Sequence, residues 1–407
     1  MAVLKTAETK QLGPKKAALN FIFFTILIDF LGYGIIAPLY AFYVLQFSTS
    51  AFIIGLLATS YALMQFIFSP ILGALSDRFG RRPILLLSQL GAAIGYILFA
   101  TSDQLWLLFV SRMIAGLTAG NISTAQAYIA DVTSIENRSK GFAIFGAASG
   151  LGIVLGPLIA VVAVKHSLAL PSLVAAGFAL LNLIYGLFVL PESHVKRTAR
   201  SLTIFNPIKT LVKYLSMPRV NIITLAIFMM YLCYLSIQTI LALFAVDRFG
   251  YGPSQVAYIL TYVGFLSVVF QIGLHKVINK FPEYKLGVSA FIIIVMGYLG
   301  TSFSYNLWML IISLTVTSLG NAIVQTILLG RLSRLAPESE QGSIMGASQS
   351  MNSLAAIIGP ILGGLLYQYF GAGAPYLGAV VFALIALSCF TFSFNKVGQT
   401  STNQKMI

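Results

Sequence analysis

The stretch that decides the fold is Gly73-Ala-Leu-Ser-Asp77-Arg78-Phe-Gly80-Arg81-Arg82-Pro83, which joins two long apolar runs of the chain. Gly73 can let a neighbouring helix approach closely, and Gly80 permits a turn that is closed to β-branched residues. Asp77 can pair with Arg81 and can cap or pin the end of a facing helix. The segment therefore predicts a tight charged loop that latches one conformation. A plain basic loop at a membrane surface is the alternative.

The composition around this loop is that of a chain surrounded by lipid. Hydrophobic residues make up 58% of the 407 residues, and charged residues only 9%. A soluble domain carries about 25% charged residues, so most of this chain must meet a solvent that tolerates no charge. The net charge of +14 does not indicate a nucleic-acid partner, because the basic residues are scattered in short runs instead of gathered on one face.

Twelve apolar segments of the sequence can span a membrane. Each span takes about 20 residues as a helix. Backbone groups in lipid must hydrogen-bond within their own segment, which excludes lone strands. The predicted helices cover residues 18–43, 51–73, 83–101, 105–131, 138–164, 171–190, 220–246, 254–275, 286–303, 307–331, 342–367 and 373–394.

The positions of lysine and arginine set the predicted orientation. With the N-terminus in the cytoplasm, the outside loops contain only Lys165 and Arg248, whereas the inside loops carry nearly all other basic residues. Basic residues concentrate on the cytoplasmic side of membrane proteins. The first apolar run is too long for a secretory signal peptide and lacks a cleavage site. We therefore predict that both termini are cytoplasmic and that the first helix is not cleaved.

The two halves of the sequence resemble each other. Gly95-Tyr96 recurs as Gly297-Tyr298 at an offset of 202 residues, and Gly156-Pro157 recurs as Gly359-Pro360 at 203. Each pair falls in the equivalent predicted helix of its half, which indicates an internal repeat. Such repeats place the substrate site between the halves near the bilayer midplane. We predict a tail (1–17), a six-helix bundle (18–190), a cytoplasmic linker (191–219), a second six-helix bundle (220–395) and a tail (396–407).

These motifs resemble those of the major facilitator superfamily. Residues 73–83 resemble the signature loop of that superfamily, and Arg112-x-x-x-Gly116 resembles its intramembrane arginine motif. Asp29-x-x-Gly32-x-Gly34-x-x-x-Pro38 and Gly152-x-x-x-Gly156-Pro157 are similar to patterns of its twelve-helix drug:proton antiporters, especially the tetracycline-efflux-like multidrug exporters. The resemblance implies an all-α integral membrane protein with the major facilitator fold, in which twelve transmembrane helices form two pseudo-symmetric six-helix bundles.

The sequence departs from the tetracycline exporters at two places. Ala160-Val161 stands where a glycine pair is expected after Gly156-Pro157. The stretches around Gly95-Tyr96 and Gly297-Tyr298 lack the acidic residues that tetracycline exporters carry there. These departures concern the identity of the substrate and the path of the proton.

Asp29 is the one acidic residue that lies well inside a predicted helix. Placing a carboxylate there costs about 3 kcal/mol, so a functional role is the first interpretation. We predict that Asp29 carries a proton or pairs with a cationic substrate; a structural ion pair or a helix-packing hydrogen bond is the alternative. Arg112 keeps its charge and needs a carboxylate, carbonyl groups or water. It is predicted to tune Asp29 or organise water, with a purely structural charge as the alternative.

Polar side chains recur at helical spacing on several predicted helices. Residues three or four apart share one helix face. In the superfamily that the sequence resembles, the inner helices line the cavity, and a wall of tyrosine and amide side chains suits bulky apolar ligands. Hydrogen bonds that join helices are the alternative role. The predicted cavity residues are Tyr33, Tyr61, Gln65, Tyr231, Tyr234, Gln238, Tyr262, Asn321, Gln325, Gln349 and Asn352.

The sequence carries no zinc pattern, nucleophile motif or phosphate loop, so we expect no enzyme activity, metal or cofactor. Cys233 and Cys389 lie in apolar runs and do not indicate a disulfide framework. The resemblance implies a monomeric secondary transporter of a bacterial inner membrane, which exports small amphipathic molecules or drugs in exchange for protons by alternating access. A carrier for a metabolite such as a siderophore, sugar or lipid is the alternative. A membrane sensor or enzyme on the same scaffold is a third interpretation.

Overall fold

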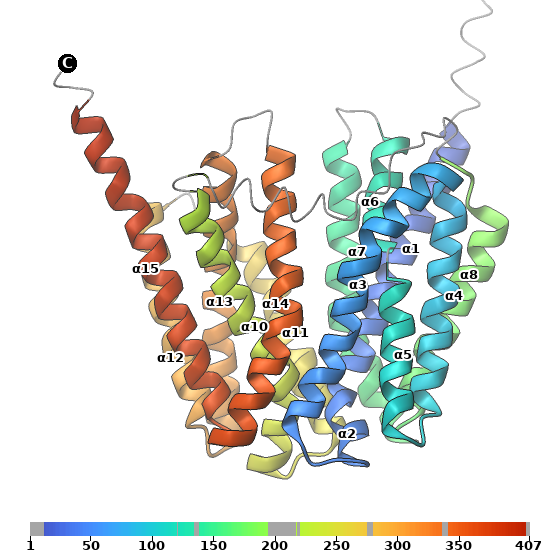
Figure 1. Cartoon of the computed structure of the whole chain (residues 1–407), viewed down its shortest axis with the longest axis horizontal. Helices are drawn as coiled ribbons and strands as arrows, with labels where there is room; N and C mark the ends of the chain where they lie inside the picture. Colours follow the sequence, from blue (N-terminus) through green and yellow to red (C-terminus); the bar gives the residue numbers. More distant parts are fainter. Residues whose placement is uncertain are drawn as a thin grey trace, which may run out of the picture. The chain divides into compact units, whose positions relative to one another are not determined.

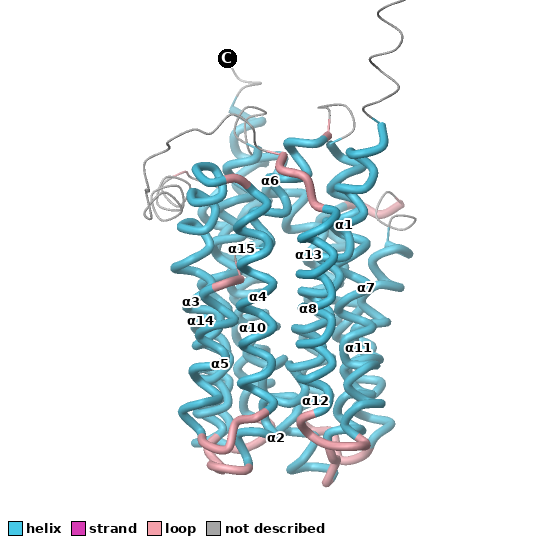
Figure 2. Tube along the Cα trace, turned by 90° about the vertical axis from the view of Figure 1, so that its right-hand side faces the viewer, coloured by secondary structure: helices cyan, strands magenta, loops and turns pink. Residues whose placement is uncertain are grey.

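The computed structural model describes residues 12–119, 121–133, 138–193, 217, 220–274, 280–335 and 341–403. Within these ranges every regular element is a helix, as Figure 2 shows. The elements, labelled in Figure 1, are α1 (Leu12–Ile36), η1 (Ala37–Leu39, a 3₁₀ turn), α2 (Tyr40–Leu45), α3 (Ala51–Phe79), α4 (Arg81–Ala100), α5 (Leu105–Leu117), α6 (Asn121–Val132), α7 (Arg138–Val164), α8 (Leu170–Val189), α10 (Val220–Phe249), α11 (Pro253–Leu274), α12 (Glu283–Ser302), α13 (Leu307–Leu335), α14 (Gln341–Phe370) and α15 (Ala374–Asn403).

The described residues contain 12 helical spans that are long and apolar enough to cross a membrane. Their positions agree with the twelve predicted segments, but two of them are interrupted. The first span breaks into α1 and α2 around Pro38, which has no N–H to donate to the helical ladder. The fourth span breaks into α5 and α6 after Thr118. The second break matters for the site, because Asn121 becomes the first residue of α6.

The described residues pack into two compact units, which differ at their edges from the two predicted bundles. The first unit comprises Met1–Leu39, Ser60–Ile204 and Pro253–Thr261, and the second comprises Tyr40–Thr59, Phe205–Gly252 and Tyr262–Ile407. The first turns of α3 therefore belong to the second unit, and the first turns of α11 belong to the first unit. The predicted linker 191–219 and tail 1–17 lie mostly outside the described residues.

The first unit is built around α1 and α4. α1 packs against α6, α7 and α8, and α4 packs against α5, α6 and α8. The apolar core at one end of this unit is formed by Phe21, Ile22, Ile26, Leu85, Tyr128 and Ile129, which are fully enclosed by their neighbours. This core fixes α1 against α4 and α6, the three helices that hold the polar groups described below.

The second unit repeats this arrangement. α10 packs against α13, α14 and α15, and α12 packs against α13 and α15. These pairs match those of the first unit if α10 corresponds to α1, α12 to α4, α14 to α7 and α15 to α8. In this correspondence α13 takes the place of α5 and α6 together. Its interior contains edge-on aromatic contacts such as Phe244 with Tyr376. The packing therefore confirms the internal repeat that the sequence predicts.

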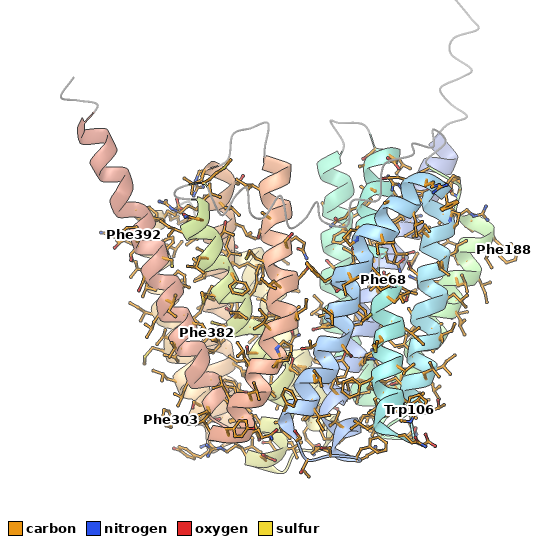
Figure 3. All side chains as sticks on the ribbon, viewed as in Figure 1. Phe68, Trp106, Phe188, Phe303, Phe382 and Phe392 are labelled. Carbon is orange, nitrogen blue, oxygen red and sulfur yellow. The ribbon has the colours of Figure 1, made fainter. Side chains whose placement is uncertain are left out.

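Large apolar side chains cover the outside of the helices. Figure 3 shows Phe188, Phe303 and Phe392 on the outer faces of their helices, and 85% of Phe188 is exposed. An apolar exterior of this kind suits a surface that faces lipid.

Candidate functional site

The predicted signature loop is a sharp turn between α3 and α4. α3 ends at Phe79, Gly80 has φ +109°, and α4 begins at Arg81. Residues with a side chain rarely adopt this conformation, so the turn requires glycine, as the sequence predicts. A side chain at Gly80 would also collide with the carboxylate of Glu192. The backbone conformation is the stronger of the two constraints, because the flexible Glu192 side chain can move aside.

Arg81 is the centre of a charged cluster in this turn. Its Nη1 lies 2.6 Å from Asp77 Oδ1 and donates to Ser76 Oγ at 2.5 Å. Its Nε donates to Asp131 Oδ2 at 3.3 Å, so the guanidinium joins the end of α3 to the end of α6. The pairing of Asp77 with Arg81 confirms the contact that their spacing predicts. The sequence of the loop alone does not predict that Asp131 is a second partner of Arg81.

Glu192 completes the cluster from beyond the end of α8. Its Oε1 accepts from the backbone N–H of Arg81 at 2.8 Å, and its Oε2 accepts from that of Arg82 at 3.2 Å. These N–H groups open α4 and have no partner inside the helix, so a carboxylate there is favourable. The side chain of Arg82 in turn donates to the Leu187 carbonyl oxygen at 2.7 Å. The cluster thus joins the ends of four helices, α3, α4, α6 and α8.

Gly73 differs from the prediction. Among the described residues, no atom lies within 4 Å of the position that a Cβ at Gly73 would occupy. The close approach of a neighbouring helix is therefore not seen at this residue. Gly116, in the arginine motif, does provide such an approach, because a Cβ there would meet Met64 Cβ at 2.9 Å and the backbone of Tyr61.

We expect Arg81→Met to lower the stability of the protein strongly. It leaves the carboxylates of Asp77 and Asp131 without the cation between them, which costs about 3 kcal/mol for a partly buried pair. The control is Arg78→Met in the same turn, where the side chain is exposed and lies over the ring of Phe79. Thermal unfolding in detergent measures both variants. Equal melting temperatures for the two would contradict the structural role of Arg81.

The embedded carboxylate of Asp29 is bonded by two amides. Gln89 Nε2 on α4 donates to Asp29 Oδ1 at 3.0 Å, and Asn121 Nδ2 on α6 donates to the same oxygen at 3.1 Å. Gln89 is fully buried and Asn121 is 4% exposed, whereas Asp29 is only partly buried. Among the described residues, Asp29 makes no ion pair and Oδ2 accepts no hydrogen bond. The arrangement holds one oxygen and leaves the other available.

Arg112 is buried on α5 and does not contact Asp29. Its Nη2 donates to the Gly95 carbonyl oxygen at 3.5 Å, and its guanidinium lies 4.5 Å from the ring centre of Phe99 and 5.6 Å from that of Tyr96. A guanidinium can be held by aromatic faces and a carbonyl group in this way. Any influence of Arg112 on Asp29 must therefore act over a distance or through Tyr96, which packs against Gly32 on α1.

The predicted antiporter motif forms the seam between α1 and α7. A Cβ at Gly156 would lie 2.6 Å from the Leu31 carbonyl oxygen and 2.7 Å from Gly34 Cα. A Cβ at Gly152 would lie 2.8 Å from the Leu27 carbonyl oxygen. Gly34 in turn faces the ring of Pro157, with 2.9 Å from its Cβ position to Pro157 Cδ. These glycines bring two backbones together directly beside the turn of α1 that carries Asp29.

The predicted cavity residues fall in both units. Tyr33, Tyr61 and Gln65 belong to the first, and the other eight belong to the second. Tyr231 on α10 lies within hydrogen-bonding reach of Ser348 and Gln325, from α14 and α13. Tyr262 shares a 2.7 Å hydrogen bond with Thr315. These contacts are of the helix-joining kind, and the role of the set as a cavity wall stays a prediction.

A basic residue near the end of a membrane helix is expected to extend its charge to the membrane surface, but Arg331 does not. It is 9% exposed, and its Nε and Nη2 donate to Ser393 Oγ at 3.0 Å and to the Ser393 carbonyl oxygen at 2.9 Å. It therefore joins α13 to α15 within the second unit.

The described residues include no group of three or more metal-ligating side chains, and Cys233 and Cys389 are free thiols.

Two repeated sets of apolar helices, with the carboxylate of Asp29 embedded among them, define an integral membrane protein. Comparison with known proteins names the family. The model of the Major Facilitator Superfamily matches residues 22–305 and 286–405. The chain therefore belongs to the Major Facilitator Superfamily, whose members are transporters and not enzymes.

Individual relatives agree with this assignment. The chain is 33% identical to the class C tetracycline resistance protein of Escherichia coli over 380 residues, which is 91% of this chain and 95% of that one. It is 27% identical to multidrug resistance protein 2 of Bacillus subtilis (strain 168), over 88% of this chain and 91% of that one. The crystal structure of a bacterial homologue of the human lysosomal transporter Spinster superposes with a TM-score of 0.78 at 13% identity, covering 94% of this chain and 97% of that one. This last match supports the fold alone.

Proposed function

We propose that the protein is a proton-coupled antiporter that exports small amphipathic molecules or drugs across the inner membrane of a bacterium. Relatives named for tetracycline and multidrug resistance match nearly the whole chain, which supports drug export. The proposal rests most of all on Asp29, whose carboxylate sits inside a span with one oxygen bonded and the other available. Such an acid is costly in a membrane unless it serves transport.

In the proposed cycle, Asp29 takes up a proton while the carrier is open to the outside. The two halves then change to an inward-open arrangement, where release of the proton accompanies capture of the substrate. The return step exports the substrate. A membrane potential of about 100 mV supplies ~2.3 kcal/mol per charge moved. That energy supports a substrate gradient of roughly 50-fold per proton.

The charged cluster at the α3–α4 turn is proposed as the latch of this cycle. The proposed latch comprises Gly73, Asp77, Gly80, Arg81 and Arg82, with Asp131 and Glu192 as the added partners. Because Arg81 bonds two carboxylates from different helices, a movement of α3 relative to α6 must break at least one ion pair. The cluster can therefore stabilise one state over another. We also propose that both termini lie in the cytoplasm and that the protein is a monomer.

Transport by the purified protein in liposomes tests the function. Lipophilic cations, tetracyclines and siderophore-like compounds are offered with and without an imposed proton gradient. We expect at least one amphipathic compound to accumulate against its gradient only when the proton gradient is present. Accumulation of the siderophore-like compounds alone would replace drug export with a metabolite carrier. Equal accumulation without a proton gradient would rule out proton coupling.

A further inference from the structure

Gln89 and Asn121 each leave a buried oxygen without a partner. Both amides point their nitrogens at Asp29 Oδ1. Gln89 Oε1 and Asn121 Oδ1 are fully enclosed and accept no hydrogen bond from the described residues. An unsatisfied buried carbonyl oxygen costs about 1–3 kcal/mol. Both oxygens belong to side chains that bond the same carboxylate, that of Asp29.

The chemistry of the three groups supplies a reason. An ionised carboxylate only accepts hydrogen bonds, so both amides must present N–H groups to it. A protonated carboxyl group also donates one hydrogen bond and then needs an acceptor. An amide that rotates by half a turn about its last bond exchanges its nitrogen for its oxygen. Gln89 and Asn121 hold their free oxygens in position for that exchange.

Other charged or titratable groups on the surrounding helices do not compete for this role. None of them bonds to Asp29 within the described part of the chain, and α7 contributes none between Ala143 and Val164. The groups concerned have partners elsewhere: Tyr33 on α1 itself, Tyr96 on α4, Arg112 on α5, Tyr128 and Asp131 on α6, and Tyr185 on α8. The two amides are therefore the direct partners of the carboxyl group.

We propose that Gln89 and Asn121 are positioning residues that follow the proton of Asp29. Both donate to the carboxylate when it is ionised, and one turns its carbonyl oxygen toward the carboxyl O–H when Asp29 takes up a proton. The switch keeps the Asp29 side chain hydrogen-bonded in both its ionised and its protonated form. The proton can therefore bind and leave without the carboxyl group losing its hydrogen-bond partners. The inference rests on the proposed role of Asp29 in proton coupling.

Infrared spectroscopy of the full-length protein in lipid tests the switch, because a protonated carboxyl group has its own C=O band. The Asp29 band is the one that is lost in Asp29→Asn, and its disappearance with rising pH gives a midpoint. We expect Gln89→Met and Asn121→Leu each to move this midpoint up by roughly one pH unit, because the charge-assisted hydrogen bond to the ionised form that is lost is stronger than the bond to the protonated form. The pH profile of transport shifts with it.

Asn182→Leu is the matched control. Asn182 is 2% exposed, donates to Thr25 Oγ1 at 3.0 Å and also has an unpartnered oxygen, but it does not touch Asp29. Its substitution should leave the midpoint unchanged. A second measurement needs no substitution at positions 89 and 121: side-chain amide bands of the parent should change with the Asp29 midpoint and should be silent in Asp29→Asn. Silent amide bands in the parent, or equal midpoints in the amide variants and the control, would overturn the switch.

The two proposals fail in different ways. If Asp29→Asn still exports substrate under a proton gradient, the proposed function fails, whatever the infrared bands do. If Asp29→Asn uncouples transport but the midpoints of the amide variants match that of Asn182→Leu, only the positioning role fails. Transport by the parent that follows Na⁺ and not pH would overturn both.

Discussion

Asp29→Asn is expected to abolish uphill export while leaving the protein folded. Asparagine has nearly the shape of aspartate, and its amide can still bond to Gln89 and Asn121, so the packing of α1 against α4 and α6 is retained. It cannot bind or release a proton in the accessible pH range. Transport against a gradient should therefore fall to the level of protein-free liposomes, whereas downhill exchange of substrate persists.

The control for this substitution is Asp103→Asn. Asp103 is an exposed acidic residue in the turn between α4 and α5, so removing its charge tests whether any acidic residue suffices. We expect it to transport like the parent. A comparison of neutral and cationic substrates adds a second test. If Asp29→Asn loses cationic substrates but still accumulates neutral ones, Asp29 binds the substrate and does not carry the proton.

Gly156→Ala is expected to lower both the stability of the protein and its transport activity. The added Cβ would lie 2.6 Å from the Leu31 carbonyl oxygen and 2.7 Å from Gly34 Cα, and backbone atoms of a packed helix cannot turn aside as side chains do. α1 and α7 must separate, which costs about 2 kcal/mol or more when a core is overpacked. The separation would also displace the turn of α1 that carries Asp29. Thermal unfolding and transport should both decline.

Gly177→Ala provides the matched comparison for that change. Gly177 lies inside α8, and no described atom comes within 4 Å of its Cβ position. The same substitution there adds a methyl group to open space and favours the helix, because alanine is a better helix former by about 1 kcal/mol. We expect an unchanged or slightly higher melting temperature. Melting of both alanine variants at the parent's temperature would contradict the close packing of α1 against α7 at Gly156.

The sequence predicts those features that depend on neighbours along the chain. The helical spans follow from runs of apolar residues, and the pair of Asp77 and Arg81 follows from a spacing of four residues on a helix. The requirement for glycine at position 80 follows from the tight turn. The same local reasoning singles out Asp29, because a lone acidic residue in an apolar run is conspicuous without any structure.

Contacts between distant residues are beyond such reasoning. Glu192 lies 111 residues from Arg81, and Asn121 lies 92 residues from Asp29, so neither spacing carries a signal. Gln89 and Asn121 look like ordinary polar residues in their own segments, since their importance comes from the packing of α4 and α6 on α1.

Arg112 and Gly73 show what a motif leaves undetermined. The motif predicts that Arg112 tunes Asp29 or organises water. The structure places Arg112 over the rings of Phe99 and Tyr96 and bonded to a carbonyl group, and both roles stay predictions. Gly73 was expected to permit close packing, which the structure instead shows at Gly116 and Gly156. A motif fixes the type of residue at a position. The neighbour that the residue meets depends on how the helices pack.

The most direct test of the account is the movement of protons when substrate is added to liposomes that contain the protein and an internal pH dye. The account predicts a substrate-triggered change in internal pH for the parent and for Asp103→Asn, and none for Asp29→Asn. Substrate transport by the parent without any proton movement would contradict the central claim, and so would an undiminished proton signal in Asp29→Asn.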